Sequence, residues 1–413
     1  MLTDVGASIT PMKHAKKHLR KWMKGEKRPT VFPLNLLGGR SRIEYQPLGV
    51  VGIISPWNFP VSMVFAPMSG ALAAGNRIMV KPSEFTPATS EVLATMIKSA
   101  YDPKEVAVFT GGPEVGQAFS NLPLDHLLFT GATSVARHIM AAAARNLVPV
   151  TLELGGKSPV IISRSADLEK SLERIMLGKT MNAGQICLAP DYLLVPEEKL
   201  HDVIATAQQV VATMYPTLLD NAQYTSVINE RHYQRLNGYL EEARERGVKV
   251  IEINPAGEDF SQQQGTHKIP PTLIPEPPED LKLLQEEIFG PLLPIRTYRE
   301  FSETVDYINS RPRPLAAYYF GDDAEEQNSV ETRTTSGGMC INDVIMHISQ
   351  EDLPFGGVGP SGMGSYHGIE GFRTFSHAKS IYRQTGMNIG KLSGMLPPYG
   401  KTTEKSIRMQ VKK

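Results

Sequence analysis

The sequence predicts an α/β protein whose N-terminal part is built on a doubly wound parallel sheet. Short apolar runs alternate with helical patterns between residues 50 and 152, and this alternation is typical of a parallel sheet with helices on both faces. The apolar runs lack the period-of-two polarity of half-exposed strands, which indicates burial on both faces. Such a sheet binds ligands at the carboxyl ends of its strands.

The expected elements begin with an amphipathic helix over residues 10–24 and a surface strand over 42–46. The first sheet takes its strands from five apolar runs and its helices from the segments between them. The expected strands are 50–54, 77–80, 106–110, 127–129 and 150–152, and the expected helices are 63–74, 88–99, 115–120 and 134–144.

From Glu153 the α/β pattern starts again and continues to about Asp343. This part is expected to contain strands 159–162 and 192–195 and helices 167–181, 200–214 and 231–246. The stretch 253–278, rich in Pro, Gly and Gln, is expected to be surface loop. We expect irregular, glycine-rich backbone over 353–371, packed against the site. A final strand over 376–383 could pair with another chain.

Composition excludes several classes of protein. The 413 residues suffice for two domains, and 43 basic against 43 acidic residues leave no net charge, so no nucleic-acid partner is expected. Two cysteines support neither a disulfide framework nor a four-cysteine zinc site, and no metal site is expected. Without an 18-residue apolar run or a signal peptide, we expect a cytoplasmic protein with no membrane span.

The sequence has no P-loop, no HExxH and no GxSxG motif. Two glycine turns, GGPEVG at 111–116 and GATSVA at 131–136, each lie between an expected strand and an expected helix. Either turn could bring a helix N-terminus close to a pyrophosphate. An ordinary glycine turn explains each of them equally well.

Three residues are candidates for catalysis. Cys187 lies among small and turn-forming residues that leave room for a ligand, although a free cysteine is more often a buried structural thiol. Glu153 ends an apolar strand, where sites form; alternatively it is a turn residue or a helix N-cap. Asn58 lies in the rigid PWNFP segment, which suits an amide that donates to an oxyanion or a plain Asx-type turn.

Taken together, these segments resemble the aldehyde dehydrogenase superfamily. The motifs PWNFP, VKPSEFTP, FTGATSVA, LELGGKSP, GQICLAP, EEIFGP and LPFGGVGPSGMGSYHG occur in the family's order across essentially the whole chain. The 34-residue interval from Glu153 to Cys187 is also the family's. The resemblance implies the aldehyde dehydrogenase fold: a Rossmann-type cofactor domain (1–152), an α/β catalytic domain (153–360) and a small oligomerisation arm (38–48 and 371–390).

The resemblance also implies a role for each matched residue. Cys187 matches the nucleophile, Glu153 the general base and Asn58 the oxyanion-hole amide. The implied cofactor-binding residues are Trp57 in the cofactor cleft, Lys81 and Glu84 at the adenosine ribose, Gly116 and Gly131 beside the adenine and pyrophosphate, and Glu287 and Phe289 at the nicotinamide ribose and ring. The implied reaction forms a thioester on Cys187, transfers a hydride to NAD(P) and releases the acid by hydrolysis.

Within the superfamily, RKWMK, EYQPLGVVGIISPWN, NAGQICLAPDY and the PPYG of the tail are most similar to the coniferyl aldehyde dehydrogenase group, near the class 3 and fatty aldehyde dehydrogenases. This similarity implies an aromatic, hydrophobic aldehyde as the substrate, with a fatty aldehyde as the alternative. Residues that could line its pocket, or equally pack the core, are Phe59, Met63, Met181, Ile186 and Leu188. A homodimer formed through the arm is also implied.

The glutamate expected at the adenosine ribose bears on cofactor choice. The carboxylate of Glu84 would repel a 2′-phosphate, which favours NAD. NADP stays an open alternative, because relatives with a glutamate here can use NADP by moving it.

Two departures from the family pattern affect these expectations. The chain starts several dozen residues later than is usual, which is expected to expose apolar surface on the cofactor domain. In the cofactor turn, Ala132 replaces the usual serine and Ala136 the usual glycine. The first change removes a hydroxyl near the pyrophosphate and the second adds a methyl where a helix approaches the cofactor, so weaker cofactor binding is expected.

Two other functions compete with the oxidising enzyme. An acylating relative that passes the acyl group to coenzyme A generally lacks the general base that Glu153 would supply. A catalytically silent protein of the same fold is opposed by the intact Cys187, Glu153, Asn58 and Glu287.

Overall fold

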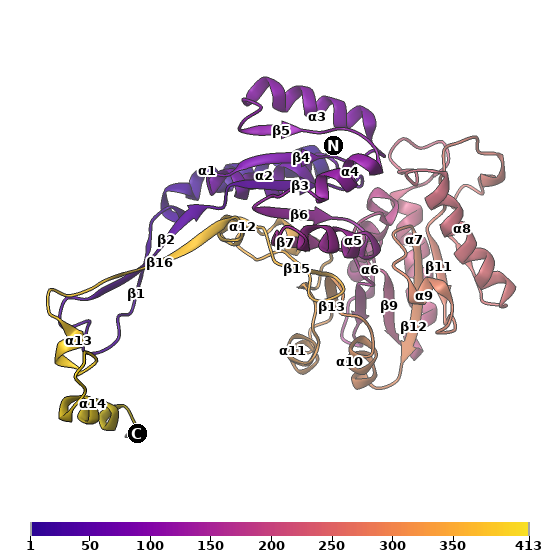
Figure 1. Cartoon of the computed structure of the whole chain (residues 1–413). Coiled ribbons are helices and arrows are strands. Elements are labelled where there is room, and N and C mark those ends of the chain that lie inside the picture. The colour runs from indigo at the N-terminus through magenta and orange to yellow at the C-terminus, as the bar shows by residue number, and fades with distance from the viewer. Residues whose placement is uncertain (1, 412–413) are drawn as a thin grey trace.

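Three sheets organise residues 2–411, the part of the chain that the computed structural model describes (Figure 1). The six-stranded sheet has the spatial order β15 (Gly362–Met363), β7 (Val150–Glu153), β6 (His126–Thr130), β3 (Val50–Ile54), β4 (Arg77–Lys81), β5 (Val106–Val108). All its pairings are parallel except that of β15 with β7. This sheet confirms the five expected N-terminal strands.

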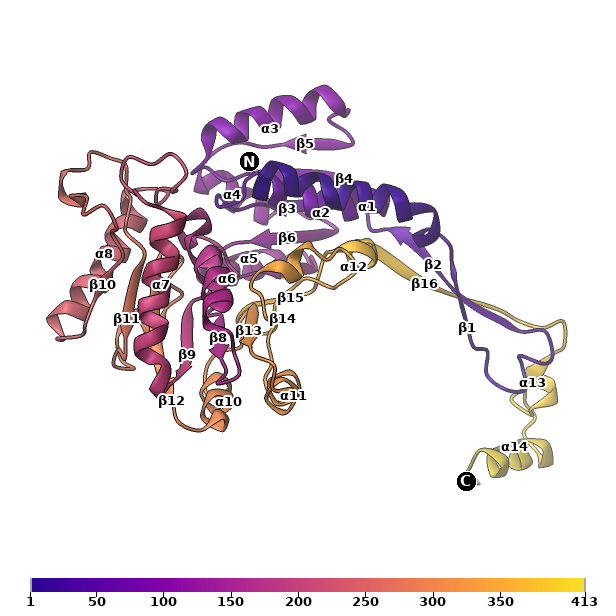
Figure 2. The same cartoon turned by 180° about the vertical axis from the view of Figure 1, so that it is seen from behind.

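Helices cover both faces of this sheet, as the doubly wound pattern predicts. On β3, Val51 and Ile53 join the apolar cluster of α2 (Ser62–Ala73) and α3 (Pro87–Ala100). Ile54 joins the cluster of α4 (Pro113–Ser120) and α5 (Thr133–Ala144) on the other face. Seen from behind, α2 lies in front of the strands together with α1 (Ala7–Trp22) (Figure 2).

The seven-stranded sheet lies beside the first one and follows the same layered design. Its spatial order is β10 (Ile251–Glu252), β11 (Thr272–Pro275), β12 (Leu292–Tyr298), β9 (Tyr192–Pro196), β8 (Pro159–Ile162), β13 (Ala316–Phe320), β14 (Gly338–Ile341). The helices that cover it are α6 (Leu168–Thr180) and α7 (Leu200–Met214) on one face, and α8 (Glu230–Glu245), α9 (Lys282–Gln285), α10 (Phe301–Asn309) and α11 (Ala324–Arg333) in the remaining clusters.

A three-stranded antiparallel sheet projects from the body as an arm. It consists of β1 (Glu26–Arg28), β2 (Arg40–Pro47) and β16 (Ser376–Arg383), and both views show α13 (Ile389–Leu392) and α14 (Lys401–Val411) at its far end (Figures 1 and 2). The strand expected over 376–383 is confirmed. It pairs with β2 of the same chain and keeps one free edge.

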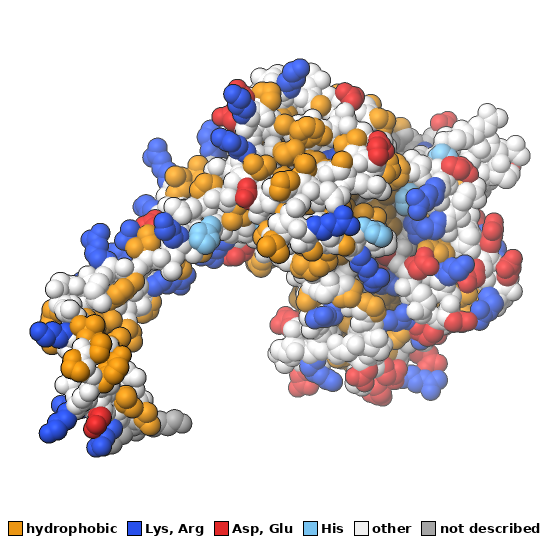
Figure 3. All heavy atoms as spheres, viewed as in Figure 1, with side chains coloured by type: hydrophobic (Ala, Val, Ile, Leu, Met, Phe, Trp, Pro, Cys, Tyr) orange, Lys and Arg blue, Asp and Glu red, His pale blue; other side chains and the backbone are white. Residues whose placement is uncertain are grey.

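Hydrophobic side chains gather at the end of the arm (Figure 3). Phe32 is 74% exposed, Met395 67% and Tyr399 70%. None of the described helices is long and apolar enough to span a bilayer.

Three expectations about local structure were wrong in part. Thr272–Pro275 lies in the expected surface loop yet forms the buried strand β11, because a four-residue apolar run between prolines carries too little periodicity to be recognised. Residues 368–371, expected to be irregular, begin α12 (Gly368–Thr374). The first helix starts at Ala7 rather than residue 10, because Pro11 is accommodated inside it.

Asn76 ties the six-stranded sheet to the arm. Its Oδ1 accepts the Gly49 N–H at 3.0 Å, and its Nδ2 donates to the Phe375 carbonyl at 2.8 Å and the Ala71 carbonyl at 3.1 Å. The side chain is buried, with 6% exposed. Phe375 directly precedes β16, so this single amide fixes where the arm leaves the body.

We predict that Asn76→Ala lowers the free energy of unfolding by about 2–4 kcal/mol, because it leaves buried backbone groups without partners. Urea denaturation measures this change. The matched control is Asn146→Ala, which removes one exposed bond to the Asn121 carbonyl and is expected to cost less than about 0.5 kcal/mol. Equal effects of the two substitutions would contradict the assignment.

Candidate active site

The expected site residues of the N-terminal part lie along the carboxyl edge of the six-stranded sheet. Trp57 and Asn58 follow β3, Lys81 ends β4, Gly131 follows β6 and Glu153 ends β7. Because these strands are parallel, their carboxyl ends meet at one edge. The edge therefore brings together residues that are up to 96 positions apart in the chain.

The other expected residues come from the opposite kind of edge, on the seven-stranded sheet. Cys187 precedes β9, and Glu287 and Phe289 precede β12. These two strands are parallel neighbours, so both segments lie at the amino edge. The candidate site is thus formed where the carboxyl edge of one sheet faces the amino edge of the other.

A left-handed turn delivers Cys187 to this junction. After α6, the φ values of Asn182, Ala183 and Gly184 are 51°, 52° and 71°. Residues other than glycine rarely adopt such positive φ values. A Cβ at Gly184 would meet the Gly290 carbonyl oxygen at 2.3 Å. The turn therefore requires glycine and packs directly against the segment that carries Glu287.

The Cys187 thiol is half-buried, with the N–H groups of Cys187 and Leu188 directed at its sulfur. Desolvation, together with the nearby Glu287 and Glu153 carboxyls, raises the pKa of the thiol to about 12. The Tyr318 hydroxyl donates to the Leu188 carbonyl at 2.6 Å. This bond ties Leu188, the residue after Cys187, to β13. In this state of the protein the sulfur is a protonated thiol at neutral pH.

Glu153 is a buried carboxyl without a partner. Only 3% of the residue is exposed, and neither carboxyl oxygen has a hydrogen-bond partner among residues 2–411. Burial raises the pKa of Glu153 well above its usual range. An unpaired carboxyl in a dry environment is costly, and carboxyls with strongly shifted pKa values cluster at functional sites, which fits the expected general base.

The Asn58 amide is held toward the Cys187 loop. Its Nδ2 donates to the Gln185 carbonyl at 3.0 Å, and its backbone carbonyl accepts from Asn182 Nδ2 at 3.1 Å. One of the two Nδ2 hydrogens is used in this way. The second remains available to an oxygen bound beside the sulfur.

Glu287 lies against the two glycines that follow Glu153. A Cβ at Gly155 would meet both Glu287 carboxyl oxygens at 2.1 Å, so no side chain fits there. The Gly156 N–H donates to the carboxyl, while Oε1 has no partner within the described chain. Burial, with the nearby Asp191 charge, raises the pKa of Glu287 to about 8.

A buried ion pair that the sequence analysis missed supports these segments. Lys157 pairs with Asp191 and donates to the Leu283 carbonyl at 2.7 Å and the Glu286 carbonyl at 3.0 Å. Asp191 also accepts the Ile288 N–H at 3.0 Å. The lysine in GGKSP and the aspartate after the cysteine motif were the available signals, but only the fold shows that they meet.

A second missed residue is Lys179, on the last turn of α6. It is 1% exposed, and burial lowers its pKa to about 8, with the Asp191 and Glu287 charges acting in the opposite direction. A lysine in a helical pattern gives no sign of burial, so the sequence alone could not identify it.

Three rings close one side of the site. Trp57 and Phe289 pack edge to face with their centroids 5.3 Å apart, and Trp57 lies 5.4 Å from His232 of α8. Phe289 adopts a positive φ of 47°, which turns the chain just after Glu287. His232 was not predicted, because a single histidine in a charged helix carries no motif.

The remaining cofactor candidates lie further along the carboxyl edge. Lys81 is buried and its Nζ lies 2.6 Å from Glu84 Oε2. A Cβ at Gly116 would lie 3.9 Å from the Lys81 side chain, so α4 begins beside this pair. At Gly131 a Cβ would lie 2.6 Å from the Phe129 ring, which keeps the turn before α5 free of side chains.

The two alanines of the cofactor turn have different surroundings. Ala132 is the N-cap of α5, where no side-chain cap is formed. Ala136 was expected to face the cofactor; instead it is 2% exposed and lies in the apolar cluster between α5 and the sheet. Its methyl can therefore affect the position of the helix but not touch a ligand.

The residues expected to line the substrate pocket differ in how deeply they are buried. Ile186 and Leu188 are buried in the apolar core, with exposures of 5% and 0%. Phe59, Met63 and Met181 are half-buried and remain the candidates for substrate contact.

Comparison with known proteins places this geometry in context. The aldehyde dehydrogenase family model matches residues 1–381. A probable coniferyl aldehyde dehydrogenase of Caulobacter vibrioides is 58% identical over the whole chain and 85% of its own length. The coniferyl aldehyde dehydrogenase of a Pseudomonas species is 54% identical over 97% of the chain and 82% of its own.

Solved structures agree with this match. AldH of Staphylococcus aureus, in a substrate-bound state, superposes with a TM-score of 0.90 at 39% identity, over 99% of this chain and 87% of that one. An aldehyde dehydrogenase of Mycobacterium tuberculosis complexed with NAD+ gives a TM-score of 0.81 at 29% identity, over 92% and 77% of the two chains.

The raised thiol pKa predicts how Cys187 reacts with iodoacetamide in the free protein. Only the thiolate reacts, and its fraction rises about tenfold per pH unit below the pKa. The alkylation rate should therefore climb steadily from pH 7 to pH 10, as followed by mass spectrometry. Cys187→Ser gives the background from Cys340. A plateau below pH 9 would show that the thiol is not suppressed.

The uncapped turn generates a second prediction. Ala132→Ser supplies a hydroxyl that can cap α5, stabilising the protein by about 1 kcal/mol, and restores a pyrophosphate contact of about 1 kcal/mol, or roughly fivefold in affinity. Isothermal titration with NAD measures the second effect. Ala144→Ser, at the other end of α5, is the control. A stabilised variant with unchanged NAD affinity would contradict the role of this turn.

Proposed function

Because the chain belongs to the aldehyde dehydrogenase family and oxidises aldehydes, we propose that it acts on coniferyl aldehyde or a similar aryl aldehyde, through a thioester on Cys187. The observation that carries this mechanism is the meeting of Cys187, Glu153, Asn58 and Glu287 at the junction of two sheet edges. The substrate class rests on two relatives at 58% and 54% identity that bear this substrate in their names. Neither comparison favours a silent or acylating function.

The first step is attack of sulfur on the aldehyde carbon. The thiol must lose its proton, since its pKa is raised to about 12. Glu153, buried and without a partner, is the base within the site that we assign to this proton. The C–S bond forms as the carbonyl π pair moves to oxygen, which gives a tetrahedral oxyanion.

Asn58 stabilises that oxyanion. Its Nδ2 is fixed by the Gln185 carbonyl at 3.0 Å. The second Nδ2 hydrogen can therefore bind the oxyanion without a rotation of the side chain. The Cys187 N–H is the second donor to the oxyanion. A preorganised donor of this kind contributes roughly 3–4 kcal/mol to the transition state. Collapse of the oxyanion expels a hydride from the same carbon and leaves the thioester.

The residues of the carboxyl edge fit a dinucleotide. The side-chain-free turn at Gly131, the Lys81–Glu84 pair and the unpartnered Glu287 oxygen suit a pyrophosphate and two riboses. A bound NAD(P) supplies the hydride acceptor. We propose NAD as the preferred form because the Glu84 carboxylate would repel a 2′-phosphate. NADP stays an alternative, because the positive charge of the neighbouring Lys81 could attract a 2′-phosphate.

Hydrolysis completes the cycle. Once the proton taken from Cys187 has passed to solvent, Glu153 removes a proton from a water that attacks the thioester carbon, the C–S bond breaks and the carboxylic acid leaves. Sulfur regains a proton. The net conversion consumes one aldehyde and one water and delivers one acid, a hydride to the acceptor and a proton.

We propose further that the chain divides into a cofactor domain (1–152), a catalytic domain (153–360) and an oligomerisation arm (38–48 and 371–390), and forms a cytoplasmic homodimer. The dimer is supported by the free edge of β16 and by the apolar side chains at the end of the arm. The cytoplasm is supported by two cysteines that stay unpaired.

The assay that tests the proposed function follows NADH at 340 nm with coniferyl aldehyde. We expect Cys187→Ala to abolish turnover, Asn58→Ala to lower kcat by about 10²–10³ and Glu153→Gln to lower it by about 10²–10⁴. Cys340→Ala, which removes the other thiol, whose partner is His347 Nδ1, is the control and should keep most of the activity. Activity surviving Cys187→Ala would reject the thioester.

The same assay decides the substrate class. A panel of coniferyl aldehyde, benzaldehyde and a long-chain aldehyde, with NAD and with NADP, should give the highest kcat/KM for coniferyl aldehyde with NAD. A preference for the long-chain aldehyde would reject the aryl assignment while leaving the family chemistry intact.

A further inference from the structure

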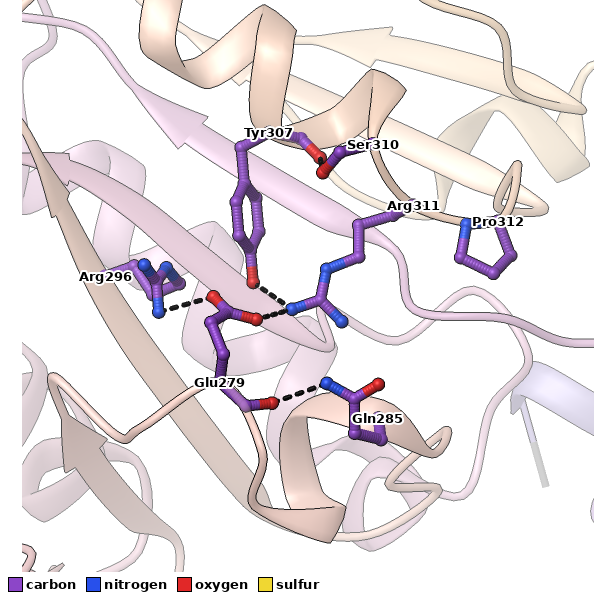
Figure 4. A pocket seen from close by; sticks show the side chains of 7 residues that line it. All are labelled: Glu279, Gln285, Arg296, Tyr307, Ser310, Arg311 and Pro312. Atoms are coloured by element: carbon purple, nitrogen blue, oxygen red, sulfur yellow. Dashed lines mark hydrogen bonds and ion pairs between the residues drawn. The ribbon is translucent and has the colours of Figure 1, made fainter.

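A groove rich in arginine lies on the seven-stranded sheet, outside the candidate active site. Its main cavity, of about 530 Å³, is lined by Glu279, Gln285, Arg296, Tyr307, Ser310, Arg311 and Pro312 (Figure 4). An adjoining cavity of about 390 Å³ shares Arg311 and Pro312 and adds Arg313, Asn309 and Thr335. We call the two cavities together the arginine groove.

Two arginines in the main cavity share one tyrosine and one carboxylate. Arg296 lies 4.8 Å and Arg311 4.9 Å from the centre of the Tyr307 ring. Arg296 Nη1 is 2.6 Å from one oxygen of Glu279, and Arg311 pairs with the other (Figure 4). Both guanidinium groups thus pack on the Tyr307 ring, and both donate to the same carboxylate, that of Glu279.

The donors of the groove exceed its acceptors. Arg296 makes this one ion pair and no other side-chain hydrogen bond in the described chain, although a guanidinium has five N–H groups. Arg313 packs on Gly359 and forms no ion pair with any described residue. Three arginines therefore face one acidic side chain, which leaves an excess of positive charge over a hollow surface.

A competing anion can displace the Glu279 carboxylate from the two arginines. Its side chain is 45% exposed, against 16% for Arg311 and 26% for Arg296. The arginines are fixed by Tyr307 and by the Leu284 carbonyl, which Arg311 donates to at 2.9 Å. The carboxylate is thus the most exposed member of the cluster, and it can turn toward solvent while the arginines stay in place.

We propose that the arginine groove binds a small organic carboxylate, held between Arg296 and Arg311 where the Glu279 carboxylate now lies. The planar, paired donors match a carboxylate in geometry. The occupant already present, a glutamate side chain, has the same functional group. The carboxylate produced by the proposed reaction and an unrelated carboxylate would both be recognised in this way.

The position of the groove links it to the site. In α9, the Leu284 carbonyl faces Arg311 and the Leu283 carbonyl faces Lys157 of the buried ion pair. Three residues after Leu284, the same segment carries Glu287. A ligand in the groove therefore contacts the outer side of the segment whose inner side forms the candidate site.

The test is isothermal titration of sodium benzoate into the full chain and three variants. Glu279→Gln removes the competing carboxylate and should tighten binding about threefold, the value of an exposed ion pair. Arg296→Gln removes the free donors and should weaken binding about tenfold or more. Arg164→Gln is the matched control: Arg164 also pairs with a glutamate and lies over a tyrosine ring, 5.4 Å from its centre, but lines neither cavity.

Benzoate held only in the substrate site would bind equally to all four proteins, and this result would overturn the proposal. So would the absence of saturable binding to Glu279→Gln, which keeps both arginines and does not depend on how Arg296→Gln folds. Inorganic phosphate that follows the same order among the variants would reject the carboxylate as the ligand class. Titration with 4-hydroxy-3-methoxycinnamate and with acetate distinguishes an aryl product from carboxylates in general.

Discussion

The buried Lys157–Asp191 pair is the contact on which the site depends. Lys157 comes four residues after Glu153, Asp191 four residues after Cys187, and together they bind the backbone of residues 283–288 just before and after Glu287. Three segments distant in sequence are thereby fixed at one point. Breaking a buried pair leaves an uncompensated charge that costs about 3–5 kcal/mol, so these segments move together or not at all.

The acidity of the site follows from the same burial. Cys187, Glu153 and Glu287 are three acids in one poorly hydrated space, and each is shifted toward its neutral form. Ionising one of them makes the next harder to ionise. The protein therefore keeps Cys187, the proposed nucleophile, as a thiol at neutral pH, which protects it from chance oxidation.

Sequence reasoning recovered the strands well and the contacts poorly. Buried parallel strands have a strong pattern, and the order of the motifs is enough to single out Cys187, Glu153 and Glu287 from the sequence alone. The short strand β11 escaped because it is flanked by prolines, and Ala136 was assigned to the ligand side because local sequence does not tell which face of α5 it occupies. The contact between Gly155 and Glu287 spans 132 positions, so only tertiary structure reveals it.

The junction of two sheet edges has a consequence for how the protein fails when it is warmed. The reacting groups are divided between the sheets. Each sheet keeps its own hydrogen-bond ladder, and one apolar cluster contains residues of both sheets. A parting of the edges that breaks the Lys157–Asp191 pair separates sulfur from carboxyl without breaking a strand pairing within either sheet. Such partial opening costs less than global unfolding. Inactivation on heating is thus expected to precede melting and to reverse on cooling.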